Sequence, residues 1–191
     1  MLRDLIVKNR SYRRFEQDLV PEKEELRKLV DLARLSASAG NKQPLKYILS
    51  TEMEKNEKIF SCLSWAAYLK DWNGPEEGEK PPAYIIILGD QELSINYDQT
   101  DAGIACQSIL LGAVEQGLGG CIFASINRKK LREELGISER HEIIYVIALG
   151  RPRERVVLEE TGEDGDIKYW HDEEGTNHVP KRPLNELIIE V

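Results

Sequence analysis

The chain has 191 residues, a formal net charge of -8 and an isoelectric point near 5.1, and its length favours one domain over two. Hydrophobic residues make up 41% and charged residues 31% of the sequence, which is ordinary for a soluble globular protein. An acidic surface repels a phosphate backbone, so the composition argues against nucleic acid as a partner.

The sequence shows no targeting or membrane segment. Asp4 and Lys8 interrupt the apolar N-terminal residues before a signal-peptide core forms. The most apolar helix candidate, residues 101–114, contains Gln107 and Ser108 and is too short to span a bilayer. The cysteines have no paired or metal-like spacing and indicate reduced cytosolic thiols; they are Cys62, Cys106 and Cys121. We therefore expect a cytoplasmic protein with no membrane partner.

In chain order, the apolar pattern predicts a mixture of helices and strands. A short amphipathic helix is expected to end near Asn9. A stronger helix follows Pro21, with glutamates in its first turn, where the helix dipole favours acids. Residues 38–44 are expected to form a loop and residues 47–49 a strand. A further helix is expected over residues 54–69.

The middle of the chain contains the most apolar elements. Residues 71–82 form a polar loop with three prolines, and the isoleucine-rich residues 83–88 suit a strand buried on both faces. Thr100 or Asp101 is expected to cap the next helix. That helix is apolar nearly all round, which predicts a central position in the fold.

The elements after this helix are shorter. Glycines at residues 117–120 end the helix and lead into a strand at residues 121–124. A short helix over residues 128–135 is closed by Gly136, and residues 143–149 predict a second fully buried strand.

The last part of the chain contains two turn signals, Asp164-Gly165 and Glu174-Gly175, which predict a hairpin near residues 167–170. Residues 184–191 are expected to form a last strand. Helices and strands are mixed without repeats, so residues 1–191 are expected to form one α+β domain, a three-layer sandwich with a central sheet.

The first candidate site is a group of three arginines within five residues, Arg10, Arg13 and Arg14. The planar guanidinium matches the oxygens of a phosphate, and Ser11 adds a hydroxyl and a backbone N–H. The cluster is therefore either an anion site in an acidic protein or a solvated basic loop paired with acids such as Glu16.

Three other segments are candidates. The small residues of 38–44 let a backbone approach a ligand, and Asn41 and Gln43 offer amides that suit a heteroaromatic ring; a plain helix C-terminal loop explains the same residues. The glycines at 117–120 feed a strand whose backbone suits a flat ligand, without a phosphate-loop pattern. A second cation pair stands at residues 181–182.

Together and in this order, these segments resemble the nitroreductase family of FMN (flavin mononucleotide) enzymes. The matching motifs are R-S-x-R-x-F at 10–15, S-x-G-N-x-Q-P at 38–44, G-L-G-x-C at 117–121, G-x-P at 150–152 and basic-P-L at 181–184. Each motif is weak alone, but the five occur in order over nearly the whole chain.

The resemblance implies a homodimer that holds FMN at its interface, built as an α-β-α sandwich around a central mixed, mainly antiparallel sheet. It implies that Arg10 and Ser11 hold the phosphate and ribityl chain and that Arg13 lies near N1 and O2 of the flavin. Lys181, with Arg182, would complete the phosphate site.

Further implied contacts come from two segments. Ser38, Asn41 and Gln43 would reach FMN, partly from the partner subunit. The residues implied near flavin N5, mostly through backbone atoms, are Phe123, Ala124 and Ser125. The family's activity implies that NADH or NADPH gives hydride to the flavin. A small electron acceptor such as a nitroaromatic or quinone then uses the same site, which predicts ping-pong kinetics.

The chain departs from the family pattern in three places. Asn9 stands where many members have arginine, Leu45 stands where many have an aromatic residue, and residues 69–82 fit no pattern, which leaves the acceptor open. A same-fold reductive dehalogenase, a flavin-cleaving enzyme or a non-catalytic flavin-binding protein are alternatives. A colourless hydrolase or interaction module is the alternative from outside the family.

Other residues give weaker signals. The three histidines are irregularly spaced and far from cysteine, so no metal site is expected. The acidic segments 164–166 and 172–175 lack the full oxygen spacing of a calcium loop and suit hairpin turns. For Cys121, we expect a packed small residue in preference to a redox thiol.

Overall fold

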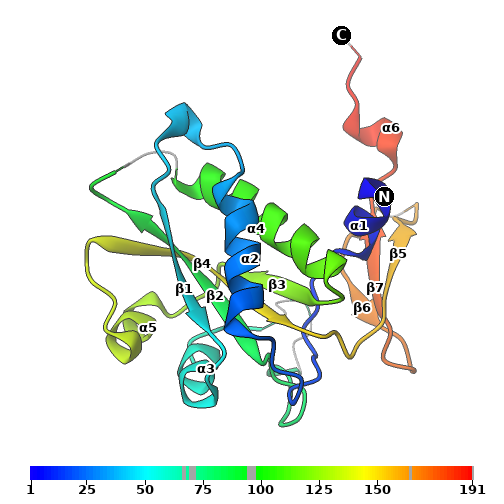
Figure 1. Ribbon diagram of the computed structural model, residues 1–191. Helices are drawn as coiled ribbons and strands as arrows, with labels where there is room; N and C mark the ends of the chain where they lie inside the picture. Colours follow the sequence, from blue (N-terminus) through cyan, green and yellow to red (C-terminus); the bar gives the residue numbers. More distant parts are fainter. Residues whose placement is uncertain (66–67, 69–71, 94–97, 164, 191) are drawn as a thin grey trace.

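The computed structural model describes residues 1–65, 68, 72–93, 98–163 and 165–190. Its centre is a four-stranded antiparallel sheet with the strand order β1-β2-β4-β3 (Figure 1). The strands are β1 (Leu45–Ser50), β2 (Ala83–Asp90), β3 (Gly119–Phe123) and β4 (His141–Gly150). β2 and β4 lie in the middle, which explains why their sequences are continuous apolar runs, as the sequence predicted.

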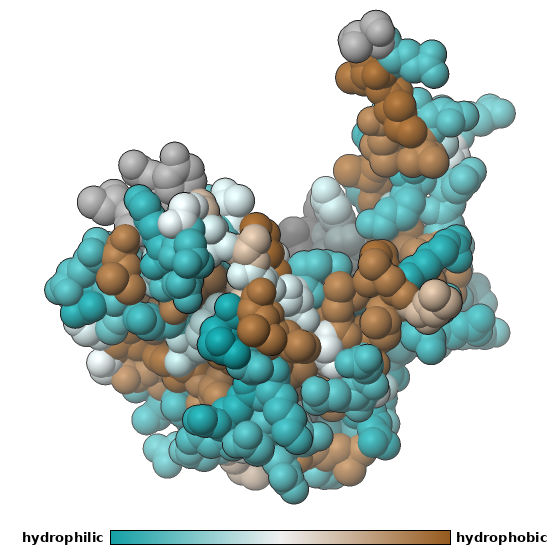
Figure 2. Space-filling view, turned by 45° about the horizontal axis from the view of Figure 1, so that its top comes forward, coloured by the Kyte–Doolittle hydropathy of each residue, from teal (hydrophilic) through white to brown (hydrophobic). Residues whose placement is uncertain are grey.

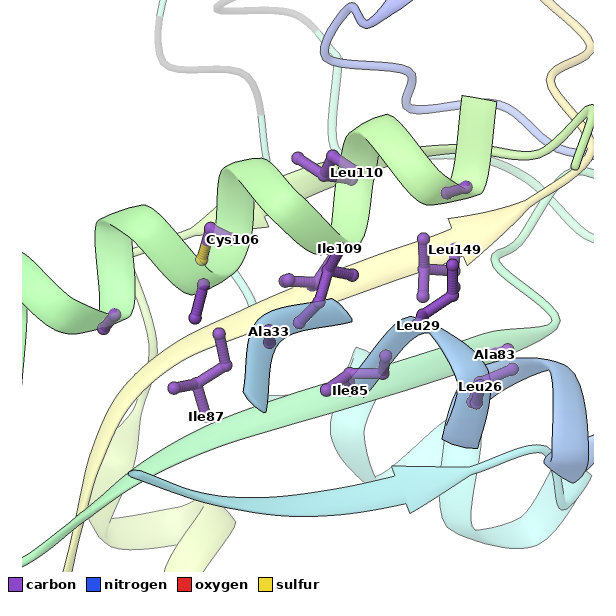
Figure 3. Close-up of a cluster of buried hydrophobic side chains, with 14 of the residues drawn as sticks. Leu26, Leu29, Ala33, Ala83, Ile85, Ile87, Cys106, Ile109, Leu110 and Leu149 are labelled. Atoms are coloured by element: carbon purple, nitrogen blue, oxygen red, sulfur yellow. The ribbon is translucent and has the colours of Figure 1, made fainter. Parts of the chain in front are cut away.

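Two helices, α2 (Lys23–Arg34) and α4 (Asp98–Glu115), pack together on one face of this sheet. Their buried side chains meet those of alternate residues of β2 and β4 (Figure 3). The residues labelled there are Leu26, Leu29, Ala33, Ala83, Ile85, Ile87, Cys106, Ile109, Leu110 and Leu149. Because α4 packs against both α2 and the sheet, its predicted central position is confirmed.

The other face of the sheet carries α3 (Met53–Phe60) and α5 (Arg128–Leu135). Ile59 of α3 and Leu131 of α5 are fully buried, in one cluster with Tyr84 and Ile86, the β2 residues that alternate with those of the first cluster. The predicted end of α5 is confirmed, because the residue after Leu135 is a glycine in the left-handed conformation, with φ of 64°.

A second sheet of three strands has the order β5-β7-β6. β5 (Val156–Glu160) pairs in parallel with β7 (Asn177–Lys181), and β6 (Trp170–His171) pairs antiparallel with β7. The short N-terminal helix α1 (Leu2–Lys8) lies beside this sheet (Figure 1). The first and last parts of the chain therefore meet on one side of the molecule.

The helix predicted over residues 54–69 ends early. Ser61 and Cys62 form a turn after α3, and Leu63 bridges Ile126. The cause is a competing partner, because the Ser64 N–H donates to the Ser125 carbonyl (3.0 Å), which draws this segment to the chain after β3. Residues 66, 67 and 69 of the predicted helix lie outside the described residues.

One prediction about the C-terminal part was confirmed in part and another was wrong. The predicted turn at Glu174–Gly175 does form a hairpin, between β6 and β7, whereas residues 167–169 are not in a strand and residue 164 lies outside the described residues. The tail starts as a single helical turn, α6 (Leu184–Leu187), and residues 188–190 are not in a strand. An extended segment becomes a strand only when it finds a partner edge.

His178 links the three strands of the second sheet. Its Nδ1 bonds Glu159 of β5, its Nε2 lies 3.1 Å from Oδ2 of Asp172 in the turn, and its ring stacks on Trp170 of β6, with centroids 4.2 Å apart. Its hydrogen bond to Glu159, and then that to Asp172, raise the pKa of His178 above its ordinary value.

This linkage predicts a pH dependence of stability. Because the folded-state pKa is raised, the stabilisation by His178 is complete below its unfolded pKa, about 6.5, and disappears as the pH rises through the folded pKa. The melting temperature of the wild type should exceed that of His178→Gln most at mildly acidic pH, and the difference should shrink towards alkaline pH. A difference that stays constant over this window would contradict the assignment.

None of the described helices combines the length and the apolar character that a membrane span requires.

Candidate functional site

A cavity of about 310 Å³ lies between the end of α1, helix α4 and the two sheets. Cationic side chains and apolar side chains share its wall, which suits a ligand that is anionic at one end and apolar at the other. The lining residues are Asn9, Arg10, Ser11, Arg13, Gln107, Leu110, Gly120, Ile122, Tyr169, Asn177, Val179 and Lys181. Four of the predicted site residues, Arg10, Ser11, Arg13 and Lys181, therefore meet here, together with Asn9, one of the three departures from the family pattern.

The segment that carries the arginines is fixed on the edge of the central sheet. Ser11 bridges Gly120 in parallel orientation, and the Tyr12 N–H donates to the Gly120 carbonyl (3.0 Å). A Cβ on Gly119 would lie 2.5 Å from Cδ2 of Tyr12, and one on Gly120 would lie 2.5 Å from the Ala148 carbonyl oxygen. These glycines are therefore required by the protein's own packing, a role that the sequence did not reveal.

A partly buried acid, Glu154, also holds the arginine segment. Its Oε1 accepts hydrogen bonds from the backbone N–H groups of Arg13 and Arg14. Burial raises the pKa of Glu154, while the hydrogen bond from Arg13 opposes this shift. Glu154 follows the predicted G-x-P motif, but no sequence pattern indicated that it acts on the arginines.

The two arginines of the cavity have different surroundings. Arg10 donates from Nη2 to the Ile6 carbonyl (2.7 Å) at the end of α1, and burial lowers its pKa. The guanidinium of Arg13 lies 4.7 Å above the centre of the Tyr169 ring and donates from Nη1 to the Ser11 carbonyl (3.3 Å). Arg10 is thus anchored to the backbone, and Arg13 rests on an aromatic face.

Two buried polar atoms at this cavity have no hydrogen-bond partner within the described part of the chain. They are Nε of Arg10, a donor, and Oδ1 of Asn177, an acceptor. Native proteins rarely leave such atoms unpaired. The cavity therefore offers one donor and one acceptor to an occupant.

Strand β3 contributes Ile122 to the cavity, with a side chain 41% exposed. Phe123 alternates with it, lies on the face of α3 and α5, and packs edge-on against Trp65 with centroids 4.7 Å apart. Ala124 and Ser125 are exposed at the end of the strand. The side chain of Phe123 thus lies on the face of the sheet away from the cavity.

The remaining C-terminal cation is placed elsewhere. Arg182 lies outside the cavity lining, and its Nη1 is 3.5 Å from Oε2 of Glu186 in α6. Tyr68, the residue before the segment 69–82 that fits no family pattern, contacts the ring of Tyr169 at the cavity, with centroids 5.1 Å apart. Residues 69–71 lie outside the described residues.

The predicted loop 38–44 lines a second cavity of about 230 Å³, to which Ser38, Gln43 and Leu45 contribute. Its backbone is strained, because Asn41 and Gln43 have φ angles of 54° and 50°, which non-glycine residues rarely adopt. The side chain of Gln43 donates to the Asn41 carbonyl (3.2 Å). Strained backbone of this kind is common at functional sites.

Asp101 holds this loop, which corrects its predicted role as a helix cap. Helix α4 already includes Asp98, so Asp101 lies inside it, 3% exposed. Its carboxylate accepts hydrogen bonds from Oγ of Ser38 (2.5 Å) and the N–H of Ala39 (3.0 Å). The aspartate thus ties the loop to the central helix.

The two cavities lie on different sides of α4. Asp101 and Ala105 line the second cavity, and Gln107 and Leu110 line the first. Successive helix residues turn by about 100°, so Ala105 and Gln107 project roughly 200° apart. One copy of the chain therefore does not bring the 38–44 loop to the arginines.

The thiols are buried and poorly ionised. Burial raises the pKa of Cys106 to about 12 and that of Cys121 to about 11. A thiol with so high a pKa is a weak nucleophile, which favours the packing role expected for Cys121. Within the described ranges, no three residues of the types His, Cys, Asp and Glu are grouped to hold a metal ion.

Comparison with known proteins adds a family and a fold. The profile of the Nitroreductase family matches residues 6–151. A protein of Methanothermobacter thermautotrophicus, provisionally assigned as an NADH dehydrogenase/NAD(P)H nitroreductase, is 31% identical over 157 residues, covering 79% of this chain and 77% of its own. A similarly assigned protein of Archaeoglobus fulgidus is 29% identical, covering 78% and 84%.

Among solved structures, an FMN-dependent nitroreductase of Clostridium difficile superimposes with a TM-score of 0.67 at 26% identity, covering 88% of this chain and 97% of that one. A nitroreductase family protein of Streptococcus pneumoniae superimposes with a TM-score of 0.72 over the whole of both chains, at 18% identity. The second likeness concerns the fold alone.

Proposed function

The chain belongs to the nitroreductase family, and from this premise we propose that it is an FMN-dependent oxidoreductase that uses NADH or NADPH to reduce a small acceptor such as a nitroaromatic or quinone. The observation that carries the proposal is the cavity where Arg10, Arg13 and Lys181 stand beside apolar side chains. An acidic protein gathers cations in this way chiefly to hold an anion.

The residues present fit FMN. Arg10 and Lys181 would hold its phosphate, and the unpaired Nε of Arg10 is a donor that such an anion would satisfy. Arg13 would hold the polar edge of the ring at N1 and O2, while Ile122 and the backbone at Phe123 would exclude water beside N5. When bound, FMN would supply the hydride and electron transfer, so no side chain needs to act as acid or base.

The proposal includes a homodimer of three-layer sandwiches, because the 38–44 loop and the arginines lie on different sides of α4 within one chain. A partner subunit would supply the loop, with Ser38, Asn41 and Gln43, to the first cavity. The exposed side of α4 supports this arrangement, since Gly103, Ile104 and Gln107 are open to solvent there, and Ile104 is 38% exposed.

The flavin released by heat from the purified protein is expected to be FMN, close to one per chain. The cavity offers cations for one terminal phosphate, and the sequence contains no dinucleotide fingerprint. Chromatography of the released cofactor identifies it. Stoichiometric FAD, or a protein that stays colourless after incubation with FMN, would overturn the proposal.

Anaerobic addition of NADH or NADPH tests the activity separately. The visible flavin absorption should bleach and return when a quinone or nitroaromatic is added, and initial rates should follow ping-pong kinetics. A protein that binds FMN but does not oxidise either nicotinamide would be a flavin carrier, and reductive dehalogenation or flavin cleavage would place it among other enzymes of this fold.

A further inference from the structure

Asn177 is the most unusual residue in the wall of the first cavity. It begins β7 and is 1% exposed, its backbone N–H donates to the Arg155 carbonyl (2.8 Å), and its side-chain Oδ1 has no partner among the described residues. Alternation along β7 places Asn177, Val179 and Lys181 on the cavity side. A buried acceptor thus belongs to a residue in the cavity wall, on the strand that also carries a phosphate-binding candidate.

The acceptor needs a donor that the cavity wall does not give it. The guanidinium of Arg13 lies over Tyr169 and donates to the Ser11 carbonyl. Nη2 of Arg10 donates to the Ile6 carbonyl at the end of α1. Buried amide oxygens are nearly always hydrogen-bonded in native proteins, so the donor is expected to arrive with the occupant. A phosphate cannot supply it, because a phosphate dianion has no hydrogen to donate.

We propose that Oδ1 of Asn177 accepts a hydrogen bond from a hydroxyl of the ribityl chain of FMN. This inference rests on the proposed function. In this arrangement Lys181 and Arg10 bind the phosphate of FMN, and the apolar residues and Arg13 contact the flavin ring. Asn177 binds the hydroxyl-bearing ribityl chain that joins the phosphate to the ring. The residue therefore makes the cavity selective for a polyol linker.

The test compares two ligands on two proteins. The ligands are FMN and a flavin that carries a plain pentyl phosphate in place of the ribityl phosphate, and the proteins are the full-length wild type and Asn177→Leu, both stripped of flavin. Flavin fluorescence quenching gives the affinities. We expect the wild type to prefer FMN by at least about tenfold and Asn177→Leu to lose most of that preference.

A second readout separates binding from structure. Leucine replaces an unpaired polar group by an apolar one of similar size, so the flavin-free variant should melt at or above the wild-type temperature. Asn56→Leu is the matched control: that buried asparagine is bonded to Ser50 and to the Pro82 carbonyl, so its replacement should lower the melting temperature.

The outcomes distinguish a failure of the proposed function from a failure of the proposed role of Asn177. A wild type that does not bind FMN refutes the proposed function. A wild type that binds FMN, with an Asn177→Leu variant that keeps the full preference for the ribityl chain, refutes this inference alone. A marked fall in the melting temperature of flavin-free Asn177→Leu also refutes it, because Asn177 would then be a structural residue.

Discussion

Deletion of residues 184–191 is expected to convert the proposed homodimer into monomers that retain little FMN. Residues 184–190 project from the body of the protein, and their surface is largely hydrophobic (Figure 2). Leu184, Leu187, Ile188 and Ile189 are between 59% and 83% exposed. Apolar side chains grouped in this way indicate a surface that a partner covers, and a monomer would lack the 38–44 loop of the partner at its cavity.

Light scattering gives the mass, and the ratio of flavin to protein absorbance gives the cofactor content. Glu186→Ala is the matched control, since it removes a polar side chain of the same segment and should leave both values unchanged. A shortened protein that is still a fully flavin-loaded dimer would show that the tail is not part of the interface.

Arg13→Ala is expected to lower the midpoint potential of bound flavin by about 20–65 mV. The oxidised ring is neutral, whereas the reduced ring tends to carry negative charge at N1, so a cation there binds the reduced form more tightly. Only such differential binding moves a redox equilibrium. A charge-assisted hydrogen bond contributes about 1–3 kcal/mol, and about 30 mV corresponds to 1.4 kcal/mol for two electrons. Spectroelectrochemistry measures the shift.

Arg10→Ala is the counterpart, because a contact with the phosphate acts on both redox states alike. It should weaken FMN binding by at least about tenfold and leave the potential of the flavin that does bind almost unchanged. If Arg10→Ala moves the potential and Arg13→Ala does not, the two roles are reversed.

The central sheet was predictable because its pattern is local. Burial of β2 and β4 on both faces requires continuous apolar runs, and such runs are visible without knowledge of the partners. β7 gave no such signal, because its sequence is mostly polar and contains Pro180, which argues against a strand. The proline is tolerated since β6 pairs only with Asn177 and His178, so the missing N–H breaks no bond there.

The cationic residues of the candidate site were predictable from the sequence, whereas the uncharged residues that complete its wall were not. Arg10, Arg13 and Lys181 were found from motifs, and the structure places them at one cavity. Gln107, Ile122 and Asn177 reach the same cavity from distant parts of the chain, and no local pattern marks them. Asn177 lies on the same side of β7 as Lys181 because side chains alternate along a strand, and this relation is visible only when residues 177–181 are known to form a strand.

The wall of the first cavity is built from segments that lie far apart in the chain, which sets the order of its assembly during synthesis. Asn9–Arg13 are synthesised long before Asn177–Lys181. Contacts of such large sequence separation form late, because closing a long loop is entropically unfavourable. If FMN occupies this cavity as proposed, it binds only after β7 has been made and has joined the arginine segment, and a chain that stops short of β7 would not retain FMN.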